Sequence, residues 1–452
     1  MKLNNIVVKI YSIIPKNLQK IWKKIENSDI GSRIARGLFW SLSGSVISQS
    51  LVLLASIVVA RILGITKYGE LGIIRSTVTV FSVFAAFSLG LAATKYISEF
   101  VNKDKVKSGK IIAITSFFSF ISGALIAIIV MILAPFLAEE MFNAPQLVNE
   151  IRISAIILFF SALNGAQTGI LAGFEAFKRI AKINLYSGIL AFPVQVILTF
   201  LYGLSGSIIG FGLSFFILWI FNLRAVKQEC NKHNITIQYE NSIEELFMII
   251  RFSVPALLSG LVVSPVIWYS KTLLVNLADG YNELAIFDAS NQWRSSVLFI
   301  PIMLSQVILP IFSATDSKNE FNKILKWNIS INFIIALLMA IVLSLFSGYI
   351  MAAYGDGFES GSHVIIILAF TSVFFSISVI IGQAIVSKEK MWLTFFFNLL
   401  WSVVFLTTAL VLFNFGYGAK GLAYSYLTSY AFLAVIQLIY VNFFLKLKLK
   451  TI

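Results

Sequence analysis

One apolar stretch, residues 283–301, carries the polar side chains best able to do chemistry. It reads ELAIFDASNQWRSSVLFIP, long and apolar enough to be most of a membrane-crossing helix, yet it holds Asp288, Asn291 and Arg294. A charge that faces lipid at mid-bilayer costs about 2.5–3.5 kcal/mol on insertion scales. We therefore expect these groups to face protein or a water-filled cavity, and a cavity is the first functional hypothesis.

Recognition of an anion is the chemistry that these residue types favour. A guanidinium group matches a phosphate with two parallel hydrogen bonds, and Arg294 and Arg75 both fall inside apolar stretches. Lys271 and Asn291 would add donors to the same cavity. Asp288 would pair with one of the arginines as an internal ion pair, or hold a coupling ion (H+ or Na+). Snorkelling of Lys271 to the membrane surface is an open alternative.

A metal site and covalent chemistry have little support in the sequence. Cys230 is the single cysteine, so no intrachain disulfide can form, and His233 and His363 are far apart. No Cys/His cluster of the kind that holds zinc is present in the sequence, and no glycine-rich phosphate loop precedes a helix. We expect no enzyme, no metal and no cofactor other than a coupling ion.

The composition is that of a polytopic membrane protein. The 452 residues are 58% hydrophobic and 12% charged, whereas soluble domains carry about 25% charged residues. The net charge of +14 does not call for nucleic acid as a partner, because excess Lys and Arg in membrane proteins usually lie in cytoplasmic loops.

Twelve apolar segments must position the candidate residues, each near the ~20 residues that cross a bilayer. Their cores are 38–60, 71–97, 111–137, 151–172, 180–202, 205–223, 252–274, 284–312, 327–353, 363–386, 391–413 and 420–444. The chain divides accordingly into a basic amphipathic segment 1–36, a six-helix bundle 37–226, a cytoplasmic linker 227–250, a second six-helix bundle 251–445 and a basic tail 446–452.

The basic residues predict the orientation. With both termini in the cytoplasm, 26 of the 35 Lys and Arg fall on the inner side and three on the outer side. Such a split follows the positive-inside rule. We expect a multi-pass protein of the cytoplasmic membrane with both termini inside.

An internal repeat divides the spans into two sets of six. Glu70-Leu71-Gly72-Ile73 is repeated 213 residues later as Glu283-Leu284-Ala285-Ile286. Tyr202-Gly203 before one span corresponds to Tyr417-Gly418 before another, 215 residues later. Two six-span halves that enter and leave on the same side predict a pseudo-twofold axis along the membrane normal, with a site between the halves. The predicted fold class is all-α.

At these positions the chain resembles the polysaccharide flippases, the O-antigen and oligosaccharide-lipid branch of the multidrug/oligosaccharidyl-lipid/polysaccharide exporter superfamily. Ala60-Arg61-Ile62-Leu63-Gly64 with Tyr68-Gly69-Glu70-Leu71 is similar to their first-loop signature. The junction from Phe415 to Ser425 is similar to their penultimate-loop signature. The N-terminal extension is longer than is usual for the family.

The resemblance implies a flippase that moves a polyprenyl-pyrophosphate-linked oligosaccharide from the cytoplasmic to the outer leaflet by alternating access, for surface polysaccharide biosynthesis. It implies a cationic lumen between the bundles, in which Trp268 and Trp293 would stack on sugar rings unless they are core aromatics. Expected partners are the substrate, membrane lipids and a glycan polymerase or glycosyltransferases. The alternatives are a cation-coupled multidrug exporter, a lipid II flippase, or a membrane enzyme such as a polymerase.

Overall fold

The computed structural model describes residues 47–239, 243–313, 317–388 and 390–445. Helices joined by short turns make up these residues, and no strand occurs among them. The predicted segment 1–36, the tail 446–452 and the first part of the span 38–60, with Ser41 and Ser45, lie outside the described residues.

The helices follow one another with little intervening chain. An unlabelled helix Ile47–Leu63 comes first. It is followed by α4 (Ile65–Ala86), α5 (Leu89–Phe100), α6 (Lys105–Phe136), η1 (Leu137–Met141), η2 (Pro145–Leu147), α7 (Val148–Gly173), α8 (Phe177–His233), α9 (Ile243–Gly260), α10 (Val263–Val275), α11 (Gly280–Ser313), α12 (Lys318–Ala352), η3 (Glu359–Gly361), α13 (Ser362–Val386), α14 (Met391–Asn414), α15 (Gly418–Tyr440) and η4 (Val441–Leu445).

The surface of these helices is suited to lipid. Eight helices among the described residues are long and apolar enough to cross a membrane. Large apolar side chains point outward along them, and Phe200, Leu345 and Trp392 are all more than 70% exposed. The predicted all-α membrane fold is confirmed, while the number of twelve spans stays a prediction.

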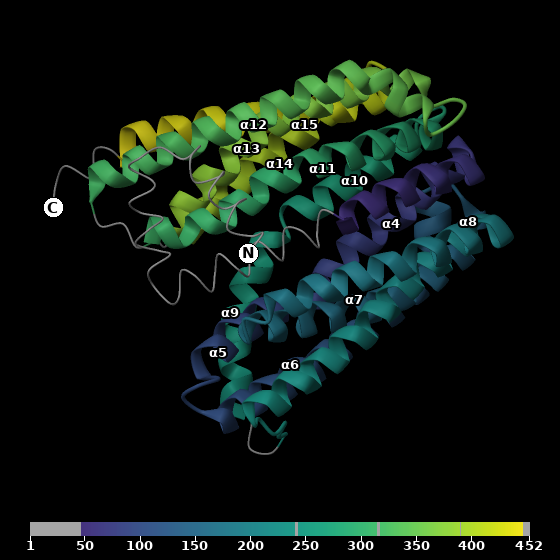
Figure 1. Ribbon diagram of the computed structural model, residues 1–452. Coiled ribbons are helices and arrows are strands. Elements are labelled where there is room, and N and C mark those ends of the chain that lie inside the picture. Colours follow the sequence, from purple (N-terminus) through teal and green to yellow (C-terminus); the bar gives the residue numbers. More distant parts are fainter. Residues whose placement is uncertain (1–46, 240–242, 314–316, 389, 446–452) are drawn as a thin grey trace, which may run out of the picture.

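The helices form two bundles that meet at one end (Figure 1). The first bundle holds the helix Ile47–Leu63 and α4 to α8, and the second holds α10 to α15. They converge where α4 packs against α10 and α11, and separate toward the other end. We call the end where the bundles meet the closed end, and Gly64, Asn143 and Asp279 lie there. We call the opposite end the basic end, and Lys103 and Lys178 lie there.

Glycine allows the helices of the two bundles to touch at the closed end. A Cβ on Gly69 of α4 would lie 1.9 Å from the backbone oxygen of Tyr281 on α11. Polar bonds surround this contact: Thr66 donates to Asn282 Oδ1 at 2.7 Å, and Tyr281 donates to the carbonyl of Phe142 at 2.7 Å. The closed end is therefore held by close backbone packing and by hydrogen bonds between the bundles.

Two expected spans are interrupted. The span 71–97 breaks between α4 and α5, where Phe87 and Ser88 both adopt left-handed backbone angles (φ 44° and 51°). Close packing accompanies this break, because a Cβ on Gly90 would lie 2.4 Å from the Gly165 carbonyl of α7. The span 252–274 breaks at 261–262, and its first part, α9, packs on the first bundle through a Tyr96 hydroxyl bond to the carbonyl of Met248 (3.2 Å).

The two predicted spans 180–202 and 205–223 form a helical hairpin within α8. The chain reverses at Gly203, whose backbone (φ 57°, ψ −130°) is not helical. Gly203 and its repeat counterpart Gly418 (φ 43°) both have positive φ, a conformation that glycine adopts at no steric cost. The predicted linker 227–250 overlaps the ends of two helices, because α8 continues to His233 and α9 begins at Ile243.

Candidate functional site

A cavity of about 630 Å³ lies between the two bundles. The first bundle contributes side chains from the helix Ile47–Leu63, α4 and α8, and the second from α10, α11 and α15. Five of the candidate residues line it, namely Arg75, Lys271, Asp288, Asn291 and Arg294. The lining runs from Ser56 and Tyr68 near the closed end to Asn184 and Leu218, which lie along α8 toward the basic end.

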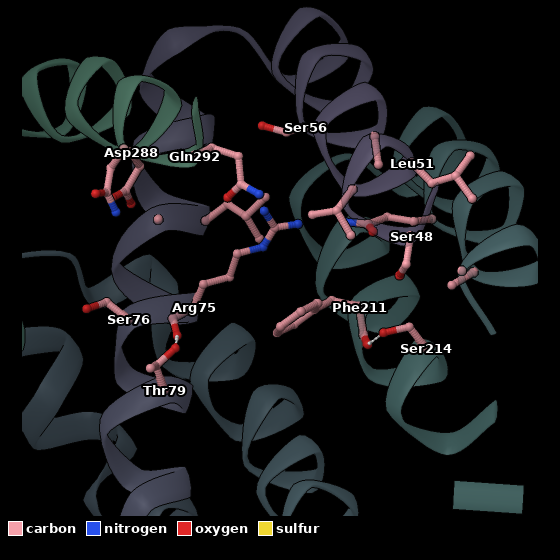
Figure 2. A pocket seen from close by; sticks show the side chains of 18 of the residues that line it. Ser48, Leu51, Ser56, Arg75, Ser76, Thr79, Phe211, Ser214, Asp288 and Gln292 are labelled. Carbon is pink, nitrogen blue, oxygen red and sulfur yellow. Dashed lines mark hydrogen bonds between the residues drawn. The ribbon is translucent and has the colours of Figure 1, made fainter. Parts of the chain in front are cut away.

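Arg75 projects from α4 into the middle of this cavity. In Figure 2 its side chain extends from the helix toward Gln292 of the other bundle, with Phe211 beside it. The guanidinium carbon lies 5.1 Å from the centre of the Phe211 ring, a cation–π contact. Its Nε is buried and has no hydrogen-bond partner in the protein.

Arg294 supplies the second guanidinium, from α11 of the other bundle. The residue is 9% exposed, and its Nε donates to Asn291 Oδ1 at 2.7 Å. Its guanidinium carbon lies 4.7 Å from the centre of the Tyr426 ring on α15. Nη1 is buried without a partner in the protein. Asn291 and Tyr426 thus fix the side chain while one donor stays unpaired.

Lys271 and Asp288 form an ion pair at the edge of the cavity. Lys271 Nζ lies 2.6 Å from Asp288 Oδ1, and the two side chains are 11% and 16% exposed. In this structure Asp288 therefore pairs with Lys271 and not with an arginine, and Lys271 is buried rather than extended to the surface. The short 276–279 connection explains the pairing, because it places α10 and α11 side by side with both residues near the closed end.

The two tryptophans do not line the cavity. Trp268 donates its indole N–H to Thr77 Oγ1 at 3.0 Å and packs edge-on against Phe81 and Phe142. Trp293 donates to the Tyr354 hydroxyl at 3.2 Å. Both indole rings are therefore engaged with protein in this structure, and stacking on sugar rings stays an untested prediction.

Among the other cavity residues, Gln292, Phe211 and Tyr426 lie beside the two arginines or the polar stretch that the sequence singled out. Gln292 belongs to the polar stretch of α11, and the rings of Phe211 and Tyr426 make the cation–π contacts with Arg75 and Arg294. A chain with 41 Phe and 15 Tyr gives no sequence signal that singles out these two rings. They are recognisable only when the helices are assembled.

Solved structures of known transporters share this architecture. The chain superimposes on an inward-facing conformation of a multidrug resistance MATE family transporter of the MOP superfamily with a TM-score of 0.72 and 16% identity, over 89% of this chain and 96% of that one. It matches a MOP superfamily transporter from Pyrococcus furiosus with a TM-score of 0.70 and 16% identity, over 92% and 96%. These likenesses establish the fold.

The chain is also similar in sequence to polysaccharide export proteins. The chain is 22% identical to the EPS I polysaccharide export inner membrane protein EpsE of Ralstonia solanacearum, over 88% of this chain and 91% of that protein. A second EpsE, from Ralstonia nicotianae, is 25% identical over 43% of this chain and 45% of that protein. The family described as polysaccharide biosynthesis protein matches residues 34–316, which is more than half of the chain. The chain therefore belongs to the polysaccharide biosynthesis protein family.

Proposed function

We propose that this protein is a flippase that moves a polyprenyl-pyrophosphate-linked oligosaccharide from the cytoplasmic to the outer leaflet for surface polysaccharide biosynthesis. The polysaccharide export relatives support the substrate class. The pyrophosphate head group and the attached sugars would occupy the cavity between the bundles, while the polyprenyl tail stays in lipid.

One observation carries this proposal: each bundle places one guanidinium in the cavity with a buried donor that no protein atom accepts. These donors are Nε of Arg75 and Nη1 of Arg294. Leaving a buried donor unpaired costs about 1–3 kcal/mol, and phosphate oxygens are strong acceptors for guanidinium groups. A ligand with two linked phosphates is well suited to two arginines that face one cavity.

The charge of the lining agrees with a dianionic head group. Among the described lining residues, Arg75, Lys271 and Arg294 are cationic and Asp288 is anionic. Because Asp288 pairs with Lys271, the two arginines are the cations left to a ligand, and a pyrophosphate diester carries two negative charges. The same balance argues against a cationic drug as the substrate, because such a substrate needs acidic groups that are free to bind it.

The distribution of basic residues supports the proposed direction. Lys103, Lys178, Lys227 and Lys388 lie at the basic end, which the positive-inside rule assigns to the cytoplasm. The cavity extends toward this end, and the bundles touch at the other end. We assign the structure to the state that loads substrate from the cytoplasmic leaflet, with both termini inside.

The proposed transport cycle needs an energy source and partners outside this chain. A coupling ion, H+ or Na+, would act through Asp288, whose release from Lys271 would change the charge of the cavity. Glycosyltransferases that build the lipid-linked oligosaccharide would supply the substrate, and a glycan polymerase would consume it on the other side.

Binding of inorganic pyrophosphate to the purified full-length protein in nanodiscs tests the proposal. We expect Arg294→Ala and Arg75→Ala each to weaken binding about 10- to 100-fold, because a hydrogen bond to a charged group contributes about 1.5–3 kcal/mol. Arg224→Ala is the matched control, since Arg224 is exposed on α8 and does not line the cavity.

Export in cells provides the second measurement. A strain that carries the Arg294→Ala protein at wild-type levels should lose surface glycan, and one with Arg224→Ala should keep it. Normal glycan export with Arg294→Ala would overturn the proposed role of the cavity.

A further inference from the structure

A second hollow lies at the closed end, beyond the candidate site. Its volume is about 420 Å³, and both bundles line it. The lining residues are Ala60, Arg61 and Gly64 of the first bundle, with Ala352, Tyr354, Gly355, Asp356 and Phe358 of the second. We call this hollow the vestibule.

A thin layer of side chains separates the vestibule from the central cavity. Ser56 and Tyr68 line the cavity, and Tyr354 lines the vestibule. The Ser56 hydroxyl lies 2.7 Å from the Tyr68 hydroxyl and 3.4 Å from the Tyr354 hydroxyl, and all three residues are at most 4% exposed. Because Tyr354 belongs to the second bundle, the Ser56–Tyr354 contact joins the two bundles across the boundary between the hollows, and the Ser56–Tyr68 bond holds the first bundle's side of it.

Aromatic packing completes the layer. Tyr68 meets Tyr354 edge-on with ring centres 6.3 Å apart, and it meets Phe358 in the same way at 5.9 Å. Trp293 donates its indole N–H to the Tyr354 hydroxyl from the inner side. This contact ties Trp293 to the layer in this structure.

Arg61 joins the two bundles at the same boundary, on the vestibule side. Its Nε donates to the carbonyl of Ala353 at 2.6 Å, and its Nη2 lies 3.5 Å from the carbonyl of Ala352. These carbonyls belong to the last turn of α12 and the residue after it. The final carbonyls of a helix have no partner in the helix and attract a cation. An arginine of the first bundle thus caps a helix of the second.

We propose that Ser56, Tyr68 and Tyr354, supported by Trp293 and Arg61, form the outer gate of the transport path, with the vestibule as its exit compartment. Each of the hydrogen bonds in this layer is individually modest, so the layer can part when the bundles separate at the closed end. The inference rests on the proposed function for its role in transport. The existence of the gate can be tested without any substrate.

Thiol labelling from each side of the membrane tests the gate. Cys230 is the single native cysteine, so Cys230→Ser provides a background without thiols. Thr79→Cys reports on the central cavity, which Thr79 lines as an exposed residue of α4. Asp356→Cys reports on the vestibule and identifies the side that the closed end faces. The reagent is a membrane-impermeant maleimide.

With the gate intact, Asp356→Cys should react from the closed-end side and Thr79→Cys should react mainly from the basic-end side. Ser56→Ala combined with Tyr354→Phe should raise labelling of Thr79→Cys from the closed-end side about fivefold or more, since the hydrogen bonds that hold the closed population are lost. Tyr202→Phe is the matched control, because Tyr202 is exposed on the α8 hairpin.

Cross-linking the two bundles at the closed end should have the opposite effect on labelling of Thr79→Cys. Thr66 and Asn282 are hydrogen-bonded across the bundles at 2.7 Å, so Thr66→Cys with Asn282→Cys can be joined by a short bifunctional thiol reagent. Joining them should abolish closed-end labelling of Thr79→Cys in the gate variant. Unchanged labelling in both experiments would overturn the gate. Pyrophosphate binding that is retained in the gate variants but lost in Arg294→Ala would separate failure of the gate from failure of the proposed function.

Discussion

The carboxylate of Asp288 on α11 lies directly against Gly72 on α4. A Cβ at position 72 would lie 2.5 Å from Asp288 Oδ2. The other carboxylate oxygen accepts from Lys271, so the carboxylate is held between a lysine of its own bundle and a glycine of the other. The ion pair therefore depends on how closely the two bundles approach.

Replacing Gly72 by alanine should disrupt this ion pair. The added methyl forces the carboxylate to turn away from Lys271, and we expect a loss of about 1–3 kcal/mol, the usual cost of overpacking a closely packed site. Thermal unfolding of the purified protein measures it. Gly348→Ala is the control, because nothing lies within 4 Å of a Cβ there. Equal unfolding temperatures for the two variants would contradict the contact.

Gly69→Ala should have a larger effect than Gly72→Ala. The atom that its methyl would meet, the backbone oxygen of Tyr281, cannot move without moving α11. The two bundles must therefore separate at the closed end. We expect a lower unfolding temperature and more closed-end labelling of Thr79→Cys in the thiol-labelling experiment. A Gly69→Ala protein that labels like the parent would contradict this close approach.

Removing Lys271 alone should cost more than removing both partners of the pair. Breaking a buried ion pair on one side leaves an uncompensated charge and destabilises by about 3–5 kcal/mol, whereas neutral replacement of both partners is often tolerated. Lys271→Ala should therefore unfold at a lower temperature than Lys271→Ala combined with Asp288→Asn. The reverse order would show that the pair does not form in the membrane.

Tyr426 should act as a positioning residue for Arg294. Tyr426→Phe keeps the ring beneath the guanidinium, and Tyr426→Leu removes it. A partly buried cation–π contact contributes about 0.5–2 kcal/mol. We expect Tyr426→Leu to weaken pyrophosphate binding several-fold and Tyr426→Phe to have little effect. Equal losses in both variants would assign the role to the hydroxyl instead.

The sequence was informative about the fold because lipid imposes a simple rule on it. Apolar length and the exclusion of charge predict where helices lie. The repeat that predicted two six-span halves includes Gly203 and Gly418, which both have positive φ in the structure. The breaks at Phe87–Ser88 and at 261–262 could not be read in this way. The first lies beside close packing of Gly90 on α7, and both interrupt apolar runs that remain continuous in composition.

The sequence could predict the residues of the candidate site, but it could not predict which cation forms the ion pair with Asp288. A charge within an apolar stretch singled out Arg294 and Asp288, because such a charge must face a cavity or a partner. Which cation pairs with Asp288 depends on how α10 and α11 lie against each other, and sequence spacing alone did not decide between Lys271 and an arginine. The rings of Phe211 and Tyr426, which contact the two guanidinium groups, belong to helices that are distant in sequence from the arginines. No local sequence pattern therefore marks them.

The α8 hairpin turns at Gly203, and the side of the protein where it turns should offer few sites for trypsin. Its two arms join without a loop, and the expected outer loops hold three basic residues in all, Arg61, Lys67 and Lys420. Trypsin, which cuts after lysine and arginine, therefore has few sites on this face and many on the opposite one. Digestion of sealed vesicles would distinguish right-side-out from inverted molecules without any tag.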